Sequence, residues 1–416
     1  MKPIVYLTGI LFLTIILSGC RDEDMDQPGR KITVTKSTEK LISGDNAFGF
    51  DLFKEVVNAN DPDTNVFISP LSVSLALAMT YNGAAGETKT GMETTLRKEG
   101  FTTAEINVMY KDLTDALLAV DPKVVMEIAN SIWYRQNLPV LQPFIEDNMN
   151  YYNAEVNELN FDAPDAKDII NNWVSEKTHE KITKIINNIP EAAVMYLINA
   201  IYFKGTWMYE FEEDKTEEEE FYLSDNTYKA VLTMKQQGEF GYSENNLFSS
   251  VELPYGDGNY SMVVMVPEWD KTVNDIIAEL NPENWQTWIG SFSKQEIVIH
   301  LPKFKFRFFD SLNTPLINMG MEDAFNPVNA DFSGITGERN VFISRVLHKT
   351  YVEVNEEGTE AAAVTAVEVN LTTATGGGET IPHFRANKPF LFVIKEKDTN
   401  AIIFIGKVMF PIIEEE

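Results

Sequence analysis

The order of the hydrophobic patterns along this chain constrains its fold more than any other feature. Apolar residues recur at helical spacing in residues 42–59, and a buried helix rich in Leu, Ala and Met follows Ser69 and Pro70. From Phe221 onward, short strand-like runs separated by turns dominate. Neither an internal repeat nor a Pro/Gly-rich linker divides the chain. This order predicts one α+β domain with large, mainly antiparallel sheets.

The same patterns predict individual elements. Residues 66–68 are predicted to be extended, residues 168–186 to begin as a helix, and the acidic run 212–220 to be a solvated turn. Further strands are predicted at residues 124–133, 193–203, 228–234, 251–253, 260–266, 296–306, 341–343, 351–355, 390–394 and 401–410.

The N-terminus has the features of a bacterial export signal. Lys2 precedes an apolar stretch, residues 4–17, that is too short to span a bilayer comfortably. The string Leu17-Ser18-Gly19-Cys20 resembles the lipobox of bacterial lipoproteins, in which the cysteine is lipidated after cleavage. We therefore expect residues 1–19 to be a signal peptide and residues 20–41 to form a lipidated N-terminus and an acidic tether. The protein would then be an exported, outward-facing (extracellular) lipoprotein of the cell envelope, anchored to the membrane through Cys20.

The charge of the chain limits its partners. The formal net charge is -29 at pH 7, which argues against nucleic acid as a partner and against electrostatic attachment to an anionic membrane. We expect a soluble, monomeric domain with an acidic surface. Cys20 is the single cysteine, so this domain has no disulfide and depends on core packing.

No group of residues suited to catalysis is evident. The chain has no Gly-x-Ser-x-Gly elbow, no His-Glu-x-x-His and no Cys-x-x-Cys. Its four histidines stand singly, without metal-ligand spacing: His179, His300, His348 and His383. We therefore expect no enzyme, no metal and no cofactor.

The most informative segment is residues 356–389, and its residues 359–371 can be examined for the alternation of a strand. With the period of two that a strand requires, one face carries only small or apolar residues and Thr, whereas both charges, Glu360 and Glu368, lie on the other face. The Ala-rich start forms strands poorly, and three glycines follow at residues 376–378. The composition favours an ordinary edge strand and loop over the alternative, a mobile loop that can become a strand.

Several motifs in this chain resemble those of a single known family. The string EEGTEAAAVTAVEV, residues 356–369, resembles the reactive-loop hinge of the serpins. Six further strings resemble serpin motifs in the same order: NVFISPLSVSLALAMTYNGAAGETKTGM, LINAIYFKGTW, ELPYGDGNYSMVVMVP, LPKFKF, FRANKPFLFVI and IIFIGKVMFP. The resemblance extends from about residue 42 to the C-terminus, so residues 42–416 are identified as a serpin-like domain.

The resemblance implies a fold and a mechanism. It implies a large five-stranded sheet backed by helices, two smaller sheets and an exposed reactive-centre loop at about residues 356–383. A protease cleaves this loop, and the freed loop inserts into the large sheet as a new strand before the acyl-enzyme is hydrolysed. Serpin loop insertion is a known case of an extended segment that adds to a sheet through main-chain hydrogen bonds. The nucleophile belongs to the protease, so the inhibitor needs no catalytic residue.

The resemblance also assigns roles to residues. Non-inhibitory members of the family often carry Pro or bulky and charged residues in the hinge, and this hinge has none, which favours an inhibitor. The implied hinge residues are Glu356, Gly358, Thr359, Glu360, Ala361, Ala362 and Ala363; the shutter residues are Ser69, Ser72, Asn199 and His348; and the breach residues are Trp207 and Lys303, with Lys303 paired to Glu356.

The cleaved bond is expected at Thr372-Thr373, or at Leu371-Thr372 if the spacing shifts by one. Neither bond presents Lys or Arg, so the expected targets are elastase-like, chymotrypsin-like or subtilisin-like serine proteases, with papain-like cysteine proteases as a further class. Two other functions stay open. One is a non-inhibitory serpin that acts as a carrier or binding module, and the other is a surface lipoprotein that binds peptides or glycans.

Overall fold

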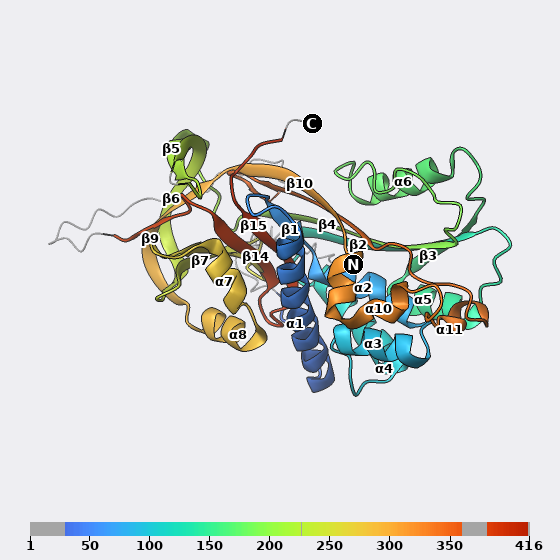
Figure 1. Ribbon diagram of the computed structural model, residues 1–416. Coiled ribbons are helices and arrows are strands. Elements are labelled where there is room, and N and C mark those ends of the chain that lie inside the picture. Colours follow the sequence, from blue (N-terminus) through green and yellow to red (C-terminus); the bar gives the residue numbers. More distant parts are fainter. Residues whose placement is uncertain (1–29, 226, 360–380, 415–416) are drawn as a thin grey trace, which may run out of the picture.

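The computed structural model describes residues 30–225, 227–359 and 381–414, and its helices and strands follow the predicted order (Figure 1). The helices are α1 (Lys36–Ala59), α2 (Pro70–Tyr81), α3 (Gly86–Thr95), α4 (Thr103–Ala119), α5 (Gln142–Tyr152), α6 (Ala166–Lys177), α7 (Val273–Glu279), α8 (Pro282–Gly290), α9 (Asn313–Leu316), α10 (Glu322–Phe325) and α11 (Ser333–Thr336). A short 3-10 helix, η1 (Glu213–Lys215), and a π-helical turn, η2 (Ile317–Met321), complete the set.

The helix starts follow from local capping chemistry. Thr35 accepts a hydrogen bond from the Thr38 N–H at the start of α1, and Ser69 caps α2, where Pro70 occupies the first turn. The cap at Thr35 starts α1 at Lys36, so the end of the predicted tether, residues 36–41, is helical instead. The sequence pattern did not predict that the helix begins at Lys36, because its first turn is polar and lacks apolar residues at helical spacing.

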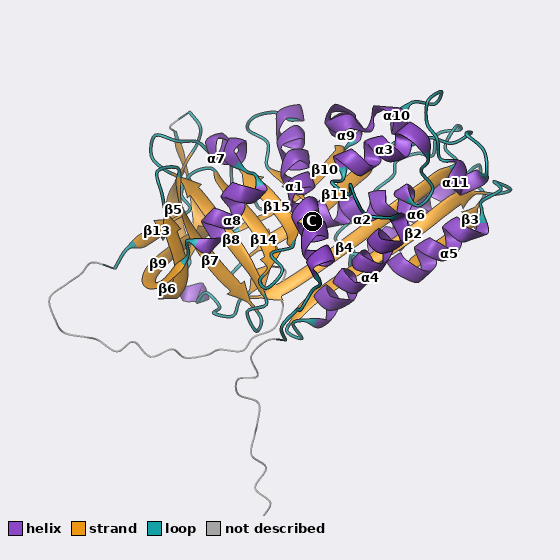
Figure 2. Ribbon diagram, turned by 90° about the horizontal axis from the view of Figure 1, so that it is seen from below, coloured by secondary structure: helices purple, strands orange, loops and turns teal. Residues whose placement is uncertain are grey.

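The large sheet has six strands in the described residues. Its order is β10 (Phe304–Ser311), β11 (Leu347–Val354), β12 (Gly358–Thr359), β4 (Met195–Thr206), β2 (Val124–Arg135) and β3 (Ala154–Leu159). Five of these strands are long and form the expected five-stranded sheet, whereas β12 has only two residues. All neighbouring pairs are antiparallel except β2 and β3. Figure 2 shows the long strands running side by side across the molecule.

In the described residues the second sheet has nine strands, and it combines the two smaller sheets that the resemblance implied. Its order is β1 (Val66–Ile68), β15 (Ile402–Val408), β14 (Phe390–Glu396), β8 (Tyr260–Pro267), β7 (Phe248–Tyr255), β6 (Tyr228–Glu244), β9 (Ser293–Pro302) and β13 (His383–Arg385), with β5 (Glu217–Tyr222) also paired to β6. Strand β6 connects the two parts of this sheet. It has 17 residues and pairs with β5 and β9 along most of its length and with β7 at its end.

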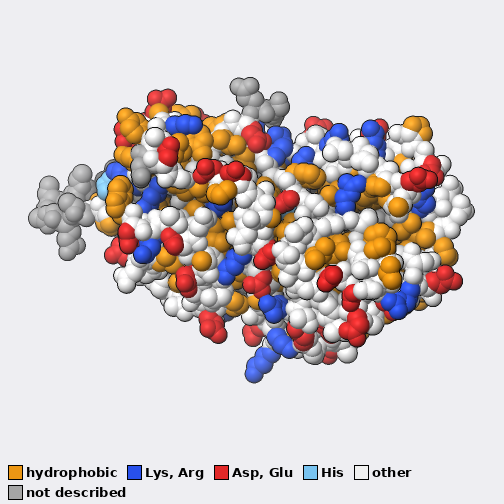
Figure 3. All heavy atoms as spheres, in the orientation of Figure 1, with side chains coloured by type: hydrophobic (Ala, Val, Ile, Leu, Met, Phe, Trp, Pro, Cys, Tyr) orange, Lys and Arg blue, Asp and Glu red, His pale blue; other side chains and the backbone are white. Residues whose placement is uncertain are grey.

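Helices cover both faces of the large sheet. Figure 1 shows α2 to α5 against one face and α6 alone against the other. The main core lies between the two sheets and α1 and α2, whereas a separate apolar layer under α6 includes Trp133, Trp173 and Ile198. Acidic and basic side chains are interspersed over the face seen in Figure 3, so the net negative charge is not gathered there in one patch.

Three predicted elements differ in the structure. Residues 341–343 are not a strand, because the backbone N–H of Ile343 bonds to the Ala324 carbonyl of α10. Residues 296–306 divide into β9 and β10 at Lys303. The acidic run 212–220 is a turn only at its start, since residues from Glu217 onward form β5, with Glu219 and Phe221 turned inward.

Candidate functional site

The hinge predicted from the sequence begins inside the large sheet, at β12. Thr359 pairs with Val354 of β11 on one side and with Gly205 of β4 on the other. Gly358 has a φ of 154°, and a Cβ atom at this position would lie 2.1 Å from the Gly205 carbonyl oxygen. Glycine is therefore required here, because any side chain would push β12 away from β4.

Two buried aromatic rings hold β12 in place. Trp207 stacks on Tyr255 with ring centroids 4.4 Å apart, and Trp207 Nε1 donates a hydrogen bond to the Asn355 carbonyl at 3.0 Å. The Tyr255 hydroxyl and Thr359 Oγ1 share a hydrogen bond of 2.6 Å. Trp207 was predicted from the sequence as a breach residue, whereas Tyr255 was missed. The sequence around Tyr255, at the end of β7, indicates only a buried core residue.

An ion pair lies beside β12. Lys303 Nζ is 2.7 Å from Glu356 Oε2, and Thr216 Oγ1 donates to Glu356 Oε1 at 2.8 Å. Burial by itself would raise the pKa of Glu356, but the hydrogen bonds from Lys303 and Thr216 outweigh it and lower that pKa. Glu356 is therefore ionised at neutral pH, and the pair joins the turn before β12 to the end of β9. Thr216 was not identified from the sequence.

Below β12, the strands β4 and β11 are separated by a groove. In the described part of the chain, β4 pairs only with β2 and β12, and β11 pairs only with β10 and β12. A cavity of about 140 Å³ lies in this groove, between α2, β4, β11 and residues 341–346. A second cavity, of about 20 Å³, lies next to Thr359, Tyr202 and Tyr351. Among the residues that the structure describes, both strands therefore present to the groove backbone edges that lack a neighbouring strand.

The segment after α6 covers the outer side of the groove. Ile182 and Ile186 are buried in the apolar layer under α6, and Lys181 Nζ lies 5.1 Å from the ring centroid of Tyr351 on β11. Two consecutive residues of this segment, His179 and Glu180, have positive φ values of 48° and 65°. Backbone strain of this kind costs about 1–3 kcal/mol per residue, so packing must hold the segment in place.

Three of the four predicted shutter residues lie together. His348 Nε2 accepts a hydrogen bond from the Ser69 N–H at 3.1 Å. The Ser69 hydroxyl donates to the Ile403 carbonyl at 2.7 Å and accepts from the Ser72 N–H at 3.2 Å. Burial lowers the pKa of His348 to about 4. His348 is therefore neutral at physiological pH, and it can accept the bond that ties β11 to the start of α2.

The fourth predicted shutter residue, Asn199, lies on β4, the other wall of the groove. Its Nδ2 donates to Asn130 Oδ1 at 2.7 Å, whereas its Oδ1 is buried and meets no donor in the described residues. Asn130 was missed from the sequence, because a polar residue inside a predicted strand gives no sign of which neighbour it meets. Thr350 of β11, also missed, donates its hydroxyl to the Phe67 carbonyl.

Several predicted site residues lie outside the described residues. They are the lipidation site Cys20, the hinge residues Glu360, Ala361, Ala362 and Ala363, and the reactive-bond residues Leu371, Thr372 and Thr373. Their roles stay predictions.

Metal-binding and membrane-spanning features are both missing from the described part of the chain. Across residues 30–225, 227–359 and 381–414, no three His, Cys, Asp or Glu side chains gather as metal ligands would. No helix in the same ranges combines the length and apolar character needed to cross a bilayer.

Comparisons with known proteins agree with this architecture. The family model described as Serpin (serine protease inhibitor) matches residues 43–411. The leukocyte elastase inhibitor of Xenopus laevis is 34% identical over 393 residues, which cover 90% of this chain and 100% of that protein. An uncharacterized serpin-like protein of Methanosarcina acetivorans is 34% identical over 404 residues, with 91% of this chain and 88% of the relative covered.

Solved structures give the same result. The thermophilic serpin tengpin in its native state superposes with a TM-score of 0.81 at 34% identity, over 91% of this chain and 96% of tengpin. Human thyroxine-binding globulin in complex with its ligand has a TM-score of 0.81 at 28% identity, over 90% of this chain and 100% of that protein. The described residues thus have the same fold as these proteins and are similar to them in sequence, and the chain belongs to the serpin family.

Proposed function

We propose that this chain is a suicide-substrate inhibitor of serine-type endopeptidases, and that its cleaved loop enters the groove between β4 and β11 as a further strand. One observation carries this proposal. Two hinge residues lie between the walls, since Gly358 pairs with β4 and Thr359 pairs with both β4 and β11, whereas the walls below them have no strand between them in the described residues. The family to which the chain belongs consists generally of protease inhibitors, which supports the same function.

The register of β12 defines how the loop would insert. Thr359 lies opposite Val354 and Gly205, and each later loop residue in an antiparallel strand would lie opposite the residue one position earlier in each wall. Thr365, six residues on, would then lie opposite His348 and Asn199. The buried Asn199 Oδ1, which meets no donor in the described residues, would gain a neighbouring hydroxyl group.

The two faces of the loop suit the two sides of the groove in this register. Val354 and Thr359 are both buried toward the core, so the odd-numbered loop residues would face the core. Burial of Val367, Val369 and Leu371 on that side would contribute about 1.5–3 kcal/mol each. The charges face outward, where Glu368 would lie opposite Arg345 on one wall, and Glu360 would lie between Glu353 and Lys204.

We propose elastase-like, chymotrypsin-like or subtilisin-like proteases as targets, because neither Leu371-Thr372 nor Thr372-Thr373 presents a basic residue. The test is to incubate the chain from Arg21 onward with neutrophil-type elastase, chymotrypsin and subtilisin, and to analyse the products by denaturing gel and mass spectrometry. A denaturant-stable covalent band with a released peptide that starts at Thr372 or Thr373 is expected. If the loop is cleaved but none of the three proteases gives a covalent band, the inhibitor proposal is refuted and a carrier function is favoured.

A matched pair of variants tests the register itself. Ala363→Glu would place a carboxylate on the core side, opposite Thr350 and Ile201, whereas Ala362→Glu would place the same group on the outer side near Lys181. An unpaired buried charge costs several kcal/mol. Ala363→Glu should therefore turn the inhibitor into a substrate, and Ala362→Glu should still form the covalent complex. Equal behaviour of the two variants would contradict this register.

We also propose that Cys20 carries the lipid and anchors an exported, envelope-facing protein. The described chain begins at Arg30, whose carbonyl accepts a bond from Asn259 Nδ2 at 2.6 Å. In the same turn between β7 and β8, the Gly256 N–H donates to the carbonyl of Thr206, the residue that pairs with Gly358. The ten residues from Cys20 to Arg30 can span at most about 35 Å, so an anchor would lie near the end of the sheet where β12 enters. Loss of membrane-fraction protein and of a labelled acyl group in Cys20→Ser is the expected result, and unchanged fractionation would refute the anchor.

A further inference from the structure

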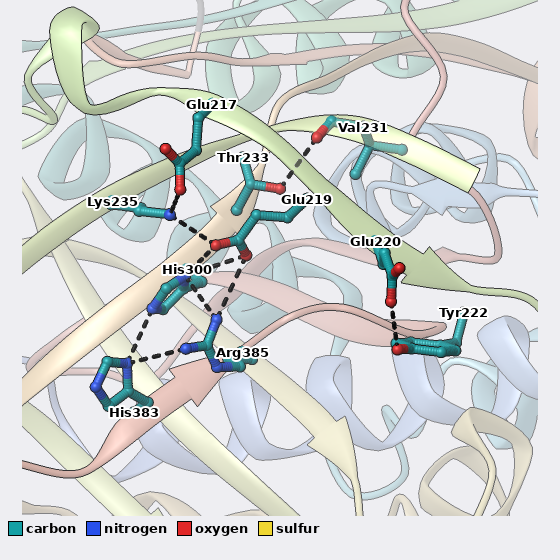
Figure 4. Close-up of polar contacts among 10 residues, drawn as sticks. All are labelled: Glu217, Glu219, Glu220, Tyr222, Val231, Thr233, Lys235, His300, His383 and Arg385. Carbon is teal, nitrogen blue, oxygen red and sulfur yellow. Dashed lines mark hydrogen bonds and ion pairs between the residues drawn. The ribbon is translucent and has the colours of Figure 1, made fainter. Parts of the chain in front are cut away.

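A polar cluster on the outer face of the second sheet surrounds β13, the strand that follows the loop (Figure 4). β13 is an edge strand of three residues, and it pairs in parallel with β9. Backbone hydrogen bonds flank it, from the Val298 N–H to the Pro382 carbonyl and from the Ala386 N–H to the His300 carbonyl, each 2.9 Å long. So short a strand has little backbone pairing, and side chains therefore contribute much of what holds it.

The cluster joins β13 to β9 and β5. His300 Nε2 lies 3.0 Å from His383 Nδ1, and His300 Nδ1 lies 2.9 Å from Glu219 Oε1. Arg385 Nη2 is 3.3 Å from His383 Nδ1, and Arg385 Nη1 is 3.1 Å from His300 Nδ1 and 3.6 Å from Glu219 Oε2. Lys235 Nζ is 2.8 Å from Glu219 Oε1. His300 is buried, whereas His383 and Arg385 reach the surface.

These distances limit how many protons the rings of His300 and His383 can carry at the same time. Two ring nitrogens 3.0 Å apart form a hydrogen bond only if one carries a proton and the other accepts it. With one proton on the His300 ring, its Nε2–H donates to His383 Nδ1, which also accepts from Arg385 Nη2, and its Nδ1 accepts from Arg385 Nη1. A proton on His300 Nδ1 would donate to Glu219 but would face the Arg385 N–H. Protonation of His383 as well puts an N–H on its Nδ1, so two N–H groups face each other and Arg385 Nη2 loses its acceptor. The doubly protonated pair therefore does not fit this geometry.

We infer that His300, His383, Glu219 and Arg385 form an acid-sensitive clasp, which holds β13 on β9 at neutral pH and releases it when both imidazoles are protonated. This inference rests on the proposed function for its consequence, because β13 is the described strand after the loop and β12 the one before it. Release of β13 would free the C-terminal end of the loop, so that uncleaved residues beyond Thr359 could enter the groove. The loop would then no longer be presented to a protease, and the inhibitor would inactivate itself in acid.

The charged side chains around the two imidazoles leave no excess negative charge that would stabilise two imidazolium groups. The charged groups that face the two imidazoles are Glu217 and Glu219 on β5, Lys235 on β6 and Arg385 on β13, with Glu239 and Glu296 further along the same face of β6 and β9. Gln237 donates a hydrogen bond to Glu296 at 2.8 Å. The two closest carboxylates balance the two permanent cations, so two imidazolium groups would add uncompensated positive charge.

The pKa of His300 agrees with this arrangement. Burial lowers it, the Glu219 carboxylate opposes that shift, and Arg385 and Lys235 lower it further. Imidazoles change charge between about pH 5 and 8. Because the released state binds at least one more proton than the clasped state, the opening equilibrium should rise by about tenfold or more per pH unit within this range.

Hydrogen exchange of the full chain, followed by mass spectrometry, tests the clasp without any protease. After correction for the intrinsic exchange rate, protection of peptides that cover residues 381–387 should fall by about tenfold or more between about pH 7 and about pH 5.5. His383→Asn keeps an acceptor near the position of Nδ1 but cannot be protonated, so protection should persist in acid. His383→Lys carries a permanent charge, so it should lose this protection already at neutral pH.

The matched control is His179→Asn, which removes a half-exposed histidine that pairs with Glu127 far along the chain from β13. It should retain the acid response of the wild-type protein. Equal protection of residues 381–387 at both pH values, an acid response that survives in His383→Asn, or a loss spread evenly over β14 and β15 would each overturn the inference.

A second readout separates the clasp from the proposed function. Wild-type protein held at about pH 5.5 and returned to neutral pH should lose its capacity for the covalent protease complex faster than His383→Asn does, again by about tenfold. If no protease complex forms even before acid treatment, the inhibitor proposal fails, while the exchange result still decides whether the clasp exists.

Discussion

His348 should make the stability of this protein depend on pH in a way that one substitution removes. Its pKa falls from 6.5 to about 4 on burial, so the native state keeps it neutral while the unfolded chain takes up a proton. The contribution of His348 to stability is therefore fully present above about pH 6.5 and is lost as the pH falls toward about 4. His348→Gln keeps an acceptor for the Ser69 N–H but has no titrating group.

The size of the effect follows from the shift. At about 1.4 kcal/mol per pKa unit, a shift of this size corresponds to about 3 kcal/mol in total. Between about pH 7.5 and about pH 5, linkage predicts that wild-type protein loses about 2 kcal/mol more than His348→Gln. The other titrating groups, including the clasp, occur in both proteins and cancel in the difference if they act independently.

Urea unfolding at the two pH values, followed by tryptophan fluorescence, measures this difference. The half-exposed His179 offers the control, because His179→Gln should keep the wild-type pH dependence. Parallel loss of stability in wild type and His348→Gln would refute the reasoning, since it would mean that His348 is protonated in the native state or is not buried.

Three further predictions follow from the site and the core. Lys98 and Asp45 form a buried ion pair 2.6 Å long, so Lys98→Met should lower the free energy of unfolding by about 3–5 kcal/mol in urea titration, because it leaves a buried carboxylate without its partner. Gly358→Ala should expel β12 and slow covalent complex formation with the protease, and unaltered kinetics would show that β12 need not be seated. Glu356→Gln removes the charge that faces Lys303 and should cost about 1–3 kcal/mol in thermal unfolding, whereas a more stable variant would indicate that the pair mainly strains the sheet.

The sequence by itself determined the fold class and the region of the site. Helical and alternating patterns act through local geometry, so α2, β4 and β14 were predicted to within a few residues. The hinge that begins at Glu356 was recognised through the resemblance of residues 356–369 to the reactive-loop motif of the serpins, not through its composition. The expected Lys303 and Glu356 lie within 2.7 Å of each other, although their role in holding the hinge is still a prediction.

Only the tertiary structure decided which residues meet across strands. Asn130 beside Asn199, Tyr255 beside Thr359, and Thr216 beside Glu356 are contacts between residues 69 to 140 positions apart in sequence. The acidic run at residues 212–220 has the composition of a solvated turn, yet Glu219 turns inward because His300, Lys235 and Arg385 come from three other strands. Burial and pairing of this kind depend on strand order, which no local pattern encodes. For the same reason, the groove between β4 and β11 and the clasp at β13 could be found only in the folded chain.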